Sequence, residues 1–215
     1  GVDLSGAYCK PGDKILVTGT LGDHGITIMS CREELGFSAD LQTDAAPLNH
    51  LIQEVIAAAP NTRCFRDPTR GGLASTLNEL AEQSQVDFVI EEDAIPVKDA
   101  VRGACEMLGY DIFQVANEGK MVCVVAADEA EAALAAMKAN KYGVDAAIIG
   151  EVVEKPEGRD SRVSLRTGFG SLRIMDMLVG ERASVRPCNN SFTILDDASK
   201  SRTKDIIVRD TNKKG

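Results

Sequence analysis

The stretch RDPTRGGLASTLNELAEQSQ, residues 66–85, joins a loop to a helix. Proline and paired glycines both oppose regular structure, so residues 66–72 are predicted to form a shaped loop. A helix start presents free N–H groups and the positive end of its dipole, and glycine lets an anion approach them closely. The alternative for an isolated Gly-Gly is a plain turn with a helix cap. The predicted helix runs to about Gln83, and its apolar face is formed by Leu73, Leu77 and Leu80.

Composition sets limits on the partners of this chain of 215 residues. Hydrophobic residues make up 44% of it, which is enough for a substantial core, and no run approaches the length of a membrane span. The formal net charge of −9 argues against nucleic acid as the main partner. The charge is uneven, because residues 181–215 carry eight lysines and arginines but only five acidic residues. The two regimes suggest segments of different origin or role.

The six cysteines do not form a CxxC pair, and the chain has only two histidines. A zinc cluster is therefore not expected. Cys31, Cys105 and Cys123 fall inside periodic segments and are interpreted as small buried apolar residues. This usage is typical of the reducing cytoplasm, where we expect the protein to be located.

The remaining pattern predicts an α+β domain over residues 1–180, a layered mixed sheet with helices. Strands are expected at 15–17, 86–92, 121–127, 146–154 and 162–166, and helices at about 26–35, 48–59, 96–108 and 128–141. Helices and strands mix without strict βαβ alternation. From residue 181 the periodicity is lost, and we interpret 181–215 as a polar, flexible tail with two short apolar patches.

Four short stretches combine small and charged residues where strands and helices are expected to meet. They are LGDHG (21–25), RDPTRGG (66–72), ANEGK (116–120) and IGEV (149–152). Loops at strand ends are where open layers usually build sites. Each has a simpler explanation: His24 could cap or pack near a helix start, Glu118 could be a solvated turn residue, and Gly150-Glu151 could be a β-bulge.

In this order and spacing, the four stretches resemble the C-terminal domain of the hydrogenase maturation factor HypE. That factor belongs to the ATP-using group typified by aminoimidazole ribonucleotide synthetase and selenophosphate synthetase. The resemblance covers about residues 1–180. GDHG together with DPTRGG is specific to HypE, whereas a lone DxTxGG would indicate only the group.

The resemblance implies a carbamoyl dehydratase in [NiFe]-hydrogenase maturation. Such proteins carry a carbamoyl group on a cysteine near the C-terminus, received from the carbamoyltransferase HypF. ATP then activates the carbamoyl oxygen, and loss of phosphate leaves a thiocyanate. The cyano group passes to iron through the HypC–HypD scaffold complex, and the complete protein is expected to form a homodimer.

Parts of that chemistry can be assigned to residues. Glycines at a helix start suit phosphate oxygens with Arg70 as charge partner, and Asp67 could face a phosphate-bound Mg²⁺. Dehydration must remove protons from the carbamoyl nitrogen, for which we expect Glu118 to be the base. The other candidates for contacts with the nucleotide or the amide are His24, Gly71, Gly72 and Asn117.

Two departures from the family pattern affect these expectations. We find no counterpart of the N-terminal ATP-binding domain in these residues, so we expect them to bind ATP weakly or not at all and to lack dehydratase activity alone. The ending also differs: VRPC (185–188) echoes the PRIC ending of the family, but 27 residues follow Cys188. Cys188 is either the carrier thiol or a cysteine without a function.

Other readings stay open at this point. The chain could be a fragment of a selenophosphate or purine-pathway synthetase. It could also be a non-catalytic module that docks maturation partners or self-associates, or a fragment with no activity.

Overall fold

The computed structural model describes residues 3–32, 43–177, 194–195 and 207–208. The chain divides into two units, residues 1–179 and residues 180–215. In the second unit the two apolar patches form a short antiparallel pair, β8 (Ile194–Leu195) with β9 (Ile207–Val208). The rest of the expected tail, including Cys188, lies outside the described residues. No helix in the described ranges is long and apolar enough to cross a membrane.

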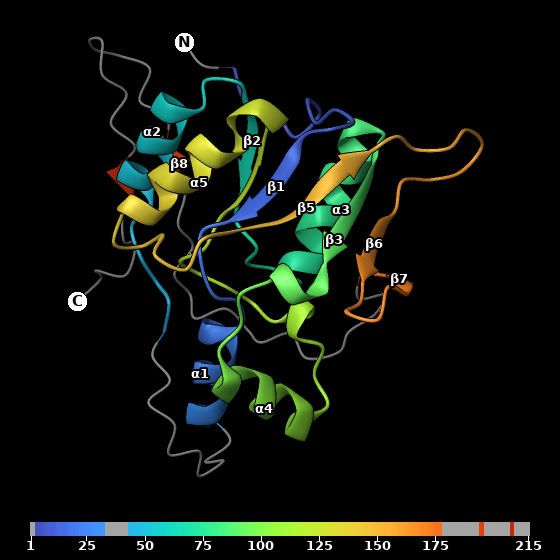
Figure 1. Ribbon diagram of the computed structural model, residues 1–215. Coiled ribbons are helices and arrows are strands. Elements are labelled where there is room, and N and C mark those ends of the chain that lie inside the picture. Colours follow the sequence, from blue (N-terminus) through green and yellow to red (C-terminus); the bar gives the residue numbers. More distant parts are fainter. Residues whose placement is uncertain (1–2, 33–42, 178–193, 196–206, 209–215) are drawn as a thin grey trace. The chain divides into compact units, whose positions relative to one another are not determined.

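The first unit is built on a seven-stranded sheet in the order β2-β4-β1-β5-β3-β6-β7, with helices on both faces (Figure 1). Only the pairing of β3 with β6 is parallel, so the sheet is mixed and the α+β prediction is confirmed. The strands are β1 (Lys14–Val17), β2 (Thr62–Arg66), β3 (Asp87–Glu91), β4 (Val122–Val125), β5 (Ala147–Val153), β6 (Val163–Arg166) and β7 (Leu172–Ile174).

In the described part of this unit, five α-helices and three short 3-10 helices accompany the sheet. The α-helices are α1 (Asp23–Arg32), α2 (Asn49–Ala58), α3 (Gly72–Ser84), α4 (Asp99–Leu108) and α5 (Ala130–Ala139). The 3-10 helices are η1 (Glu92–Ala94), η2 (Ile112–Gln114) and η3 (Ala127–Glu129).

Alternation along the central strands creates two cores, one on each face of the sheet. In β1, Ile15 and Val17 point to one face and pack with the leucines of α3, while Leu16 points to the other face. There it packs with Leu51 of α2 and Met137 of α5. Because successive strand side chains point to opposite faces, a fully apolar strand needs helices on both sides. The helix pair α2 and α5 and the helix α3 supply them.

The sequence prediction missed β2 and placed the start of α4 too early. β2 is an edge strand of five residues in which two are arginines and only Thr62 and Cys64 are buried, so its apolar signal is weak. Pro96 was expected to begin a helix, but its carbonyl accepts the N–H of Leu21 (3.0 Å) instead. Lys98 is extended, and its carbonyl accepts the N–H groups of Val101 and Arg102 in the first turn of α4. The segment before α4 is therefore hydrogen-bonded to the loop that follows β1.

IGEV is also not a strand–helix joint, because it lies inside β5. Ile15 is opposite Gly150 and Leu16 is opposite Ile148, so Ile149 is the extra residue of a bulge. A Cβ at Gly150 would lie 2.3 Å from the carbonyl oxygen of Val89, which explains the glycine by the close approach of β3. The bulge was predicted at Gly150-Glu151 and lies one residue earlier, at Ile149, and the placement of IGEV among the site loops is wrong.

Candidate functional site

Sheet register brings three of the four predicted loops together. Val17 at the end of β1 and Arg66 at the end of β2 are both opposite Val122, the first residue of β4. Because β4 runs antiparallel to both neighbours, the loop that precedes β4 (116–120) meets the loops that follow β1 (18–22) and β2 (67–71). LGDHG, RDPTRGG and ANEGK therefore share one end of the sheet.

Asn117 joins these three loops through its side chain. Its Oδ1 accepts the N–H of Gly22 at 2.7 Å, and its Nδ2 donates to the carbonyls of Pro68 (3.2 Å) and Val115 (2.9 Å). Its own N–H donates to Pro68 as well, at 3.2 Å. Asn117 is 1% exposed, so its side chain is surrounded by protein atoms and faces no solvent. Asn117 was expected to contact the amide of a substrate, but the structure places it beneath the loops as their common link.

Asn117→Ala should therefore lower the free energy of unfolding by about 2 kcal/mol, because it leaves a buried donor and two buried acceptors without this partner. Urea denaturation of the chain measures the loss. Asn61→Ala is the matched control, since the exposed Asn61 side chain bonds to Glu129 alone among the described residues, and its effect should stay within about 0.5 kcal/mol. Equal losses for the two variants would contradict the linking role.

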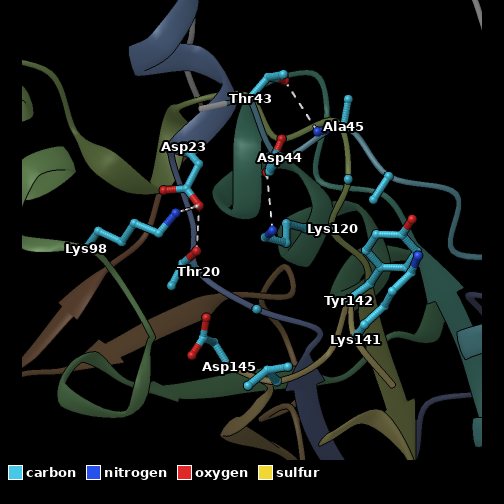
Figure 2. A pocket seen from close by; sticks show the side chains of 14 residues that line it. Thr20, Asp23, Thr43, Asp44, Ala45, Lys98, Lys120, Lys141, Tyr142 and Asp145 are labelled. Carbon is cyan, nitrogen blue, oxygen red and sulfur yellow. Dashed lines mark hydrogen bonds and ion pairs between the residues drawn. The ribbon is translucent and has the colours of Figure 1, made fainter. Parts of the chain in front are cut away.

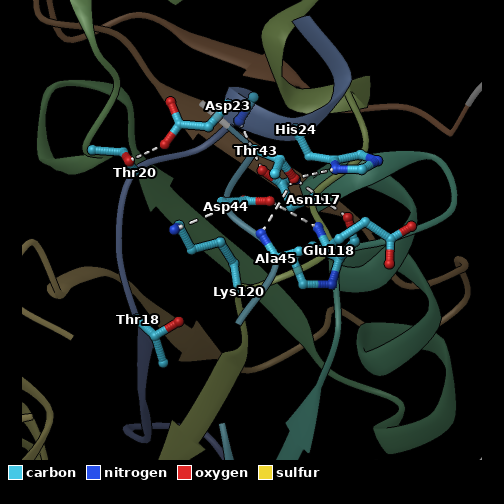
Figure 3. Close-up of polar contacts among 12 residues, drawn as sticks. Thr18, Thr20, Asp23, His24, Thr43, Asp44, Ala45, Asn117, Glu118 and Lys120 are labelled. Atoms are coloured by element: carbon cyan, nitrogen blue, oxygen red, sulfur yellow. Dashed lines mark hydrogen bonds and ion pairs between the residues drawn. The ribbon is translucent and has the colours of Figure 1, made fainter. Parts of the chain in front are cut away.

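The Glu118 carboxyl is close enough to His24 of α1 and to Asp67 of the turn at 66–72 for their charges to act on it. Figure 3 shows Glu118 together with His24 and Asp44. Its N–H donates to Asp44 Oδ1 at 3.2 Å. Burial raises the pKa of the Glu118 carboxyl, and the nearby negative charges of Asp44 and Asp67 raise it further, while His24 lowers it. A raised pKa makes the carboxylate a stronger proton acceptor, which suits a general base.

The other predicted side chains come from the same loops and differ in their exposure to solvent. His24 Nδ1 is 2.9 Å from Thr43 Oγ1. Asp67 is exposed and accepts a hydrogen bond from Thr69 Oγ1 at 2.5 Å. Arg70 is exposed, and within the described residues it makes no hydrogen bond or ion pair. Asp67 and Arg70 thus face solvent.

The two glycines at the start of α3 have a packing explanation. Gly71 is the N-cap with φ 68°, and Gly72 has φ 62°, a left-handed conformation that L side chains rarely adopt. A Cβ at Gly72 would lie 2.6 Å from the carbonyl oxygens of Phe113 and Val115. Gly72 therefore allows η2 to pack on α3. The contact of both glycines with phosphate stays a prediction.

Sequence reasoning missed a set of charged residues that line a pocket of about 290 Å³ at this end of the sheet (Figure 2). Asp23 is 2% exposed, and its Oδ2 is 3.0 Å from Lys98 Nζ. The side chain of Asp44 is 1% exposed, with Oδ2 3.8 Å from Lys120 Nζ. Asp44 belongs to the segment TDAAP (43–47) between two predicted helices, and the only local signal for it is an acid beside small residues.

The remaining predictions do not fall in this site. Glu151 pairs with Lys14 (2.7 Å) at the start of β1, away from the end where the loops meet. Cys188, the predicted carrier, lies outside the described residues. Within residues 3–32 and 43–177, no group of three His, Cys, Asp or Glu side chains is arranged to hold a metal ion. The role of Asp67 as a carboxylate for a phosphate-bound Mg²⁺ stays a prediction.

Comparison with known sequences gives a consistent result. Residues 10–161 match the family described as AIR synthase related protein, C-terminal domain. The chain is 50% identical over 182 residues to the carbamoyl dehydratase HypE of Azotobacter vinelandii, covering 85% of this chain and 52% of that protein. It thus spans about half the length of the curated relatives it matches.

Solved structures of HypE superimpose on the chain as well. HypE in its complex with HypF matches with a TM-score of 0.77 and 45% identity, covering 82% of this chain and 56% of that one. HypE in complex with ATP matches with a TM-score of 0.78 and 43% identity, covering 82% and 54%.

Proposed function

Because the chain belongs to the AIR synthase related proteins as an example of their C-terminal domain, and within them to the HypE proteins, we propose that it forms the C-terminal half of a carbamoyl dehydratase. In this proposal it acts in [NiFe]-hydrogenase maturation and converts a cysteine S-carboxamide to a thiocyanate. The observation that carries the proposal is the position of Glu118, half-buried between the acids Asp44 and Asp67 where three loops meet.

The reaction defines what the site must do. The carbamoyl oxygen takes the terminal phosphoryl group of ATP, the C–O bond then breaks, and phosphate leaves with its electron pair. The nitrogen loses two protons as the C≡N bond forms. A base with a proton affinity raised toward neutral pH suits the first deprotonation, and Glu118 has that property.

The nucleotide would meet the solvent-facing side of the same loops. Asp67 and Arg70 are exposed there, so a carboxylate for Mg²⁺ and a cation for phosphate are accessible. The free N–H groups at the start of α3 would add to this side. The HypE relative solved with ATP supports ATP as the co-substrate, and we assign the rest of its site to the half of HypE that this chain does not span.

HypF is the proposed source of the carbamoyl group, in line with the solved HypE–HypF complex. The HypC–HypD scaffold is the proposed acceptor of the product, and the complete protein is proposed to be a homodimer. Cys188 remains the candidate carrier. Comparing HypF-dependent carbamoyl loading of the chain with that of Cys188→Ala tests this assignment.

The activity is tested with a chimera that joins the chain to the N-terminal half of the Azotobacter vinelandii HypE protein. The substrate is a synthetic peptide that ends in S-carbamoylcysteine, so the result does not depend on Cys188. With ATP and Mg²⁺, mass spectrometry should show the loss of one water from the peptide, with one phosphate released per product. The chain alone should give neither.

Two outcomes would speak against this function. If the Azotobacter vinelandii protein dehydrates the peptide and the chimera does not, the dehydratase proposal is wrong. If the chimera binds HypF but still gives no product, a docking module becomes the better description.

A further inference from the structure

The segment Thr43–Asp44 lies against the loop that carries Glu118, although 74 residues separate Asp44 from Glu118 (Figure 3). It contacts three consecutive residues of that loop. Asp44 Oδ1 accepts the N–H of Glu118 at 3.2 Å, and its Oδ2 is 3.8 Å from Lys120 Nζ. Between them, a Cβ at Gly119 would lie 1.6 Å from the carbonyl oxygen of Asp44. The glycine is therefore required for this close approach.

The same segment also reaches α1. Thr43 Oγ1 is 2.9 Å from His24 Nδ1. His24 and Asp44 are two of the groups whose charges act on the Glu118 carboxyl, and they act in opposite directions. The segment 43–44 thus contacts both the Glu118 loop and His24, whose charge lowers the pKa of the Glu118 carboxyl.

Asp44 is an unusual residue to find in such a place. Its side chain is 1% exposed, and its Oδ2 has no hydrogen-bond partner among the described residues. The ammonium of Lys120, at 3.8 Å, offsets the charge but is too far for a hydrogen bond. A buried carboxylate satisfied on one oxygen only is costly, and an uncharged residue would avoid that cost. Stability alone therefore does not explain a carboxylate at this position.

We propose that Asp44 is a positioning residue for the proposed base: it fixes the Glu118 loop through the amide of Glu118 and holds a negative charge near the Glu118 carboxyl. The inference rests on the proposed function for its role in catalysis. Its physical content, the fixed amide and the charge, can be measured without that function. Asp44 acts through Glu118 and needs no contact with the substrate.

The charged groups around Glu118 determine what each substitution should do. His24 comes from α1, Asp44 from the segment before α2, Asp67 from the turn before α3, and Lys120 from the same loop. Asp44→Asn keeps an oxygen to accept the amide and removes the charge. Asp44→Ala removes both. The two variants therefore separate the charge from the hydrogen bond.

The first measurements use the chain itself. Carbon-13 NMR titration of Glu118 should give a lower pKa in both variants than in the unchanged chain, because a nearby like charge is gone. Hydrogen exchange of the Glu118 amide should become about tenfold faster in Asp44→Ala and change little in Asp44→Asn. The matched control is Asp145→Asn, since Asp145 lines the same pocket, is exposed and makes no hydrogen bond or ion pair with described residues. It should change neither quantity.

The second measurement uses the chimera. Asp44→Asn should move the acidic limb of the rate profile to lower pH, and Asp44→Ala should also lower kcat by about 10- to 100-fold through misplacement of the base. If the Glu118 pKa and amide exchange are unchanged in Asp44→Ala, the positioning role is wrong, whatever the chimera does. If both change as expected but the unchanged chimera is inactive, the proposed function fails while the positioning stands.

Discussion

Glu118→Gln is expected to slow dehydration by the chimera by about 10²- to 10⁴-fold, the range that a positioned general base contributes. Glutamine keeps the size of the side chain and its place beside Asp44 and Asp67, but it cannot take a proton. The loss should appear in kcat, with a smaller change in KM. Single-turnover conversion of the S-carbamoylcysteine peptide, followed by mass spectrometry, measures it.

The control for this variant is Glu151→Gln, which makes the same chemical change in the ion pair with Lys14 outside the site. Its rate should equal that of the unchanged chimera. If Glu118→Gln retains full activity, another group removes the protons, and Glu118 has no role in the reaction.

The same residue gives a pH dependence and a stability effect with defined signs. The folded protein raises the pKa of Glu118, so activity should fall as the pH drops through that raised value, above the usual range of a glutamate. In the same window the unfolded chain is already ionised and the folded chain is not, so stability decreases as the pH rises. Glu118→Gln removes this penalty. It should abolish the acidic limb and increase the free energy of unfolding at neutral pH.

Gly72→Ala is expected to destabilise the chain by about 4 kcal/mol. About 1–2 kcal/mol comes from a left-handed conformation in an L residue, and the rest comes from the contact of the new Cβ with two backbone carbonyls of the η2 region. Those carbonyls belong to Phe113 and Val115 and cannot rotate away as a side chain would. Chemical denaturation by urea measures the loss.

Gly158→Ala separates the two contributions. Gly158 also has a positive φ, 80°, but a Cβ there would meet nothing within 4 Å. It should cost about 1 kcal/mol, from conformation alone. A Gly72→Ala variant as stable as Gly158→Ala would mean that η2 does not pack against α3 as described.

The sequence predicted those parts of the site in which local chemistry is visible. A proline and two glycines before an apolar helix identified the turn at 66–72, and an acid beside a glycine identified the loop at 116–120. It could not identify Asp44, because TDAAP has no periodicity and the significance of the residue comes from a contact 74 positions away.

The errors in the fold have the same physical origin. β2 is a strand because β4 pairs with it, and its own residues alternate too weakly to show that. Pro96 is an acceptable first helical residue, yet its carbonyl bonds to Leu21 across the molecule. IGEV has the small and charged residues expected of a loop, but it lies inside β5, where Ile149 forms a bulge. In each case a distant partner overrides the local preference.

The side-chain amide of Asn117 bonds to Gly22, Pro68 and Val115, and this has a consequence for folding during synthesis. A nascent chain that has emerged only as far as α4 already holds the first two loops, but it lacks Asn117, whose side chain joins them. Their arrangement must wait for β4 to emerge and dock between β1 and β2. The arrangement of the three loops should therefore form late and all at once, when β4 docks.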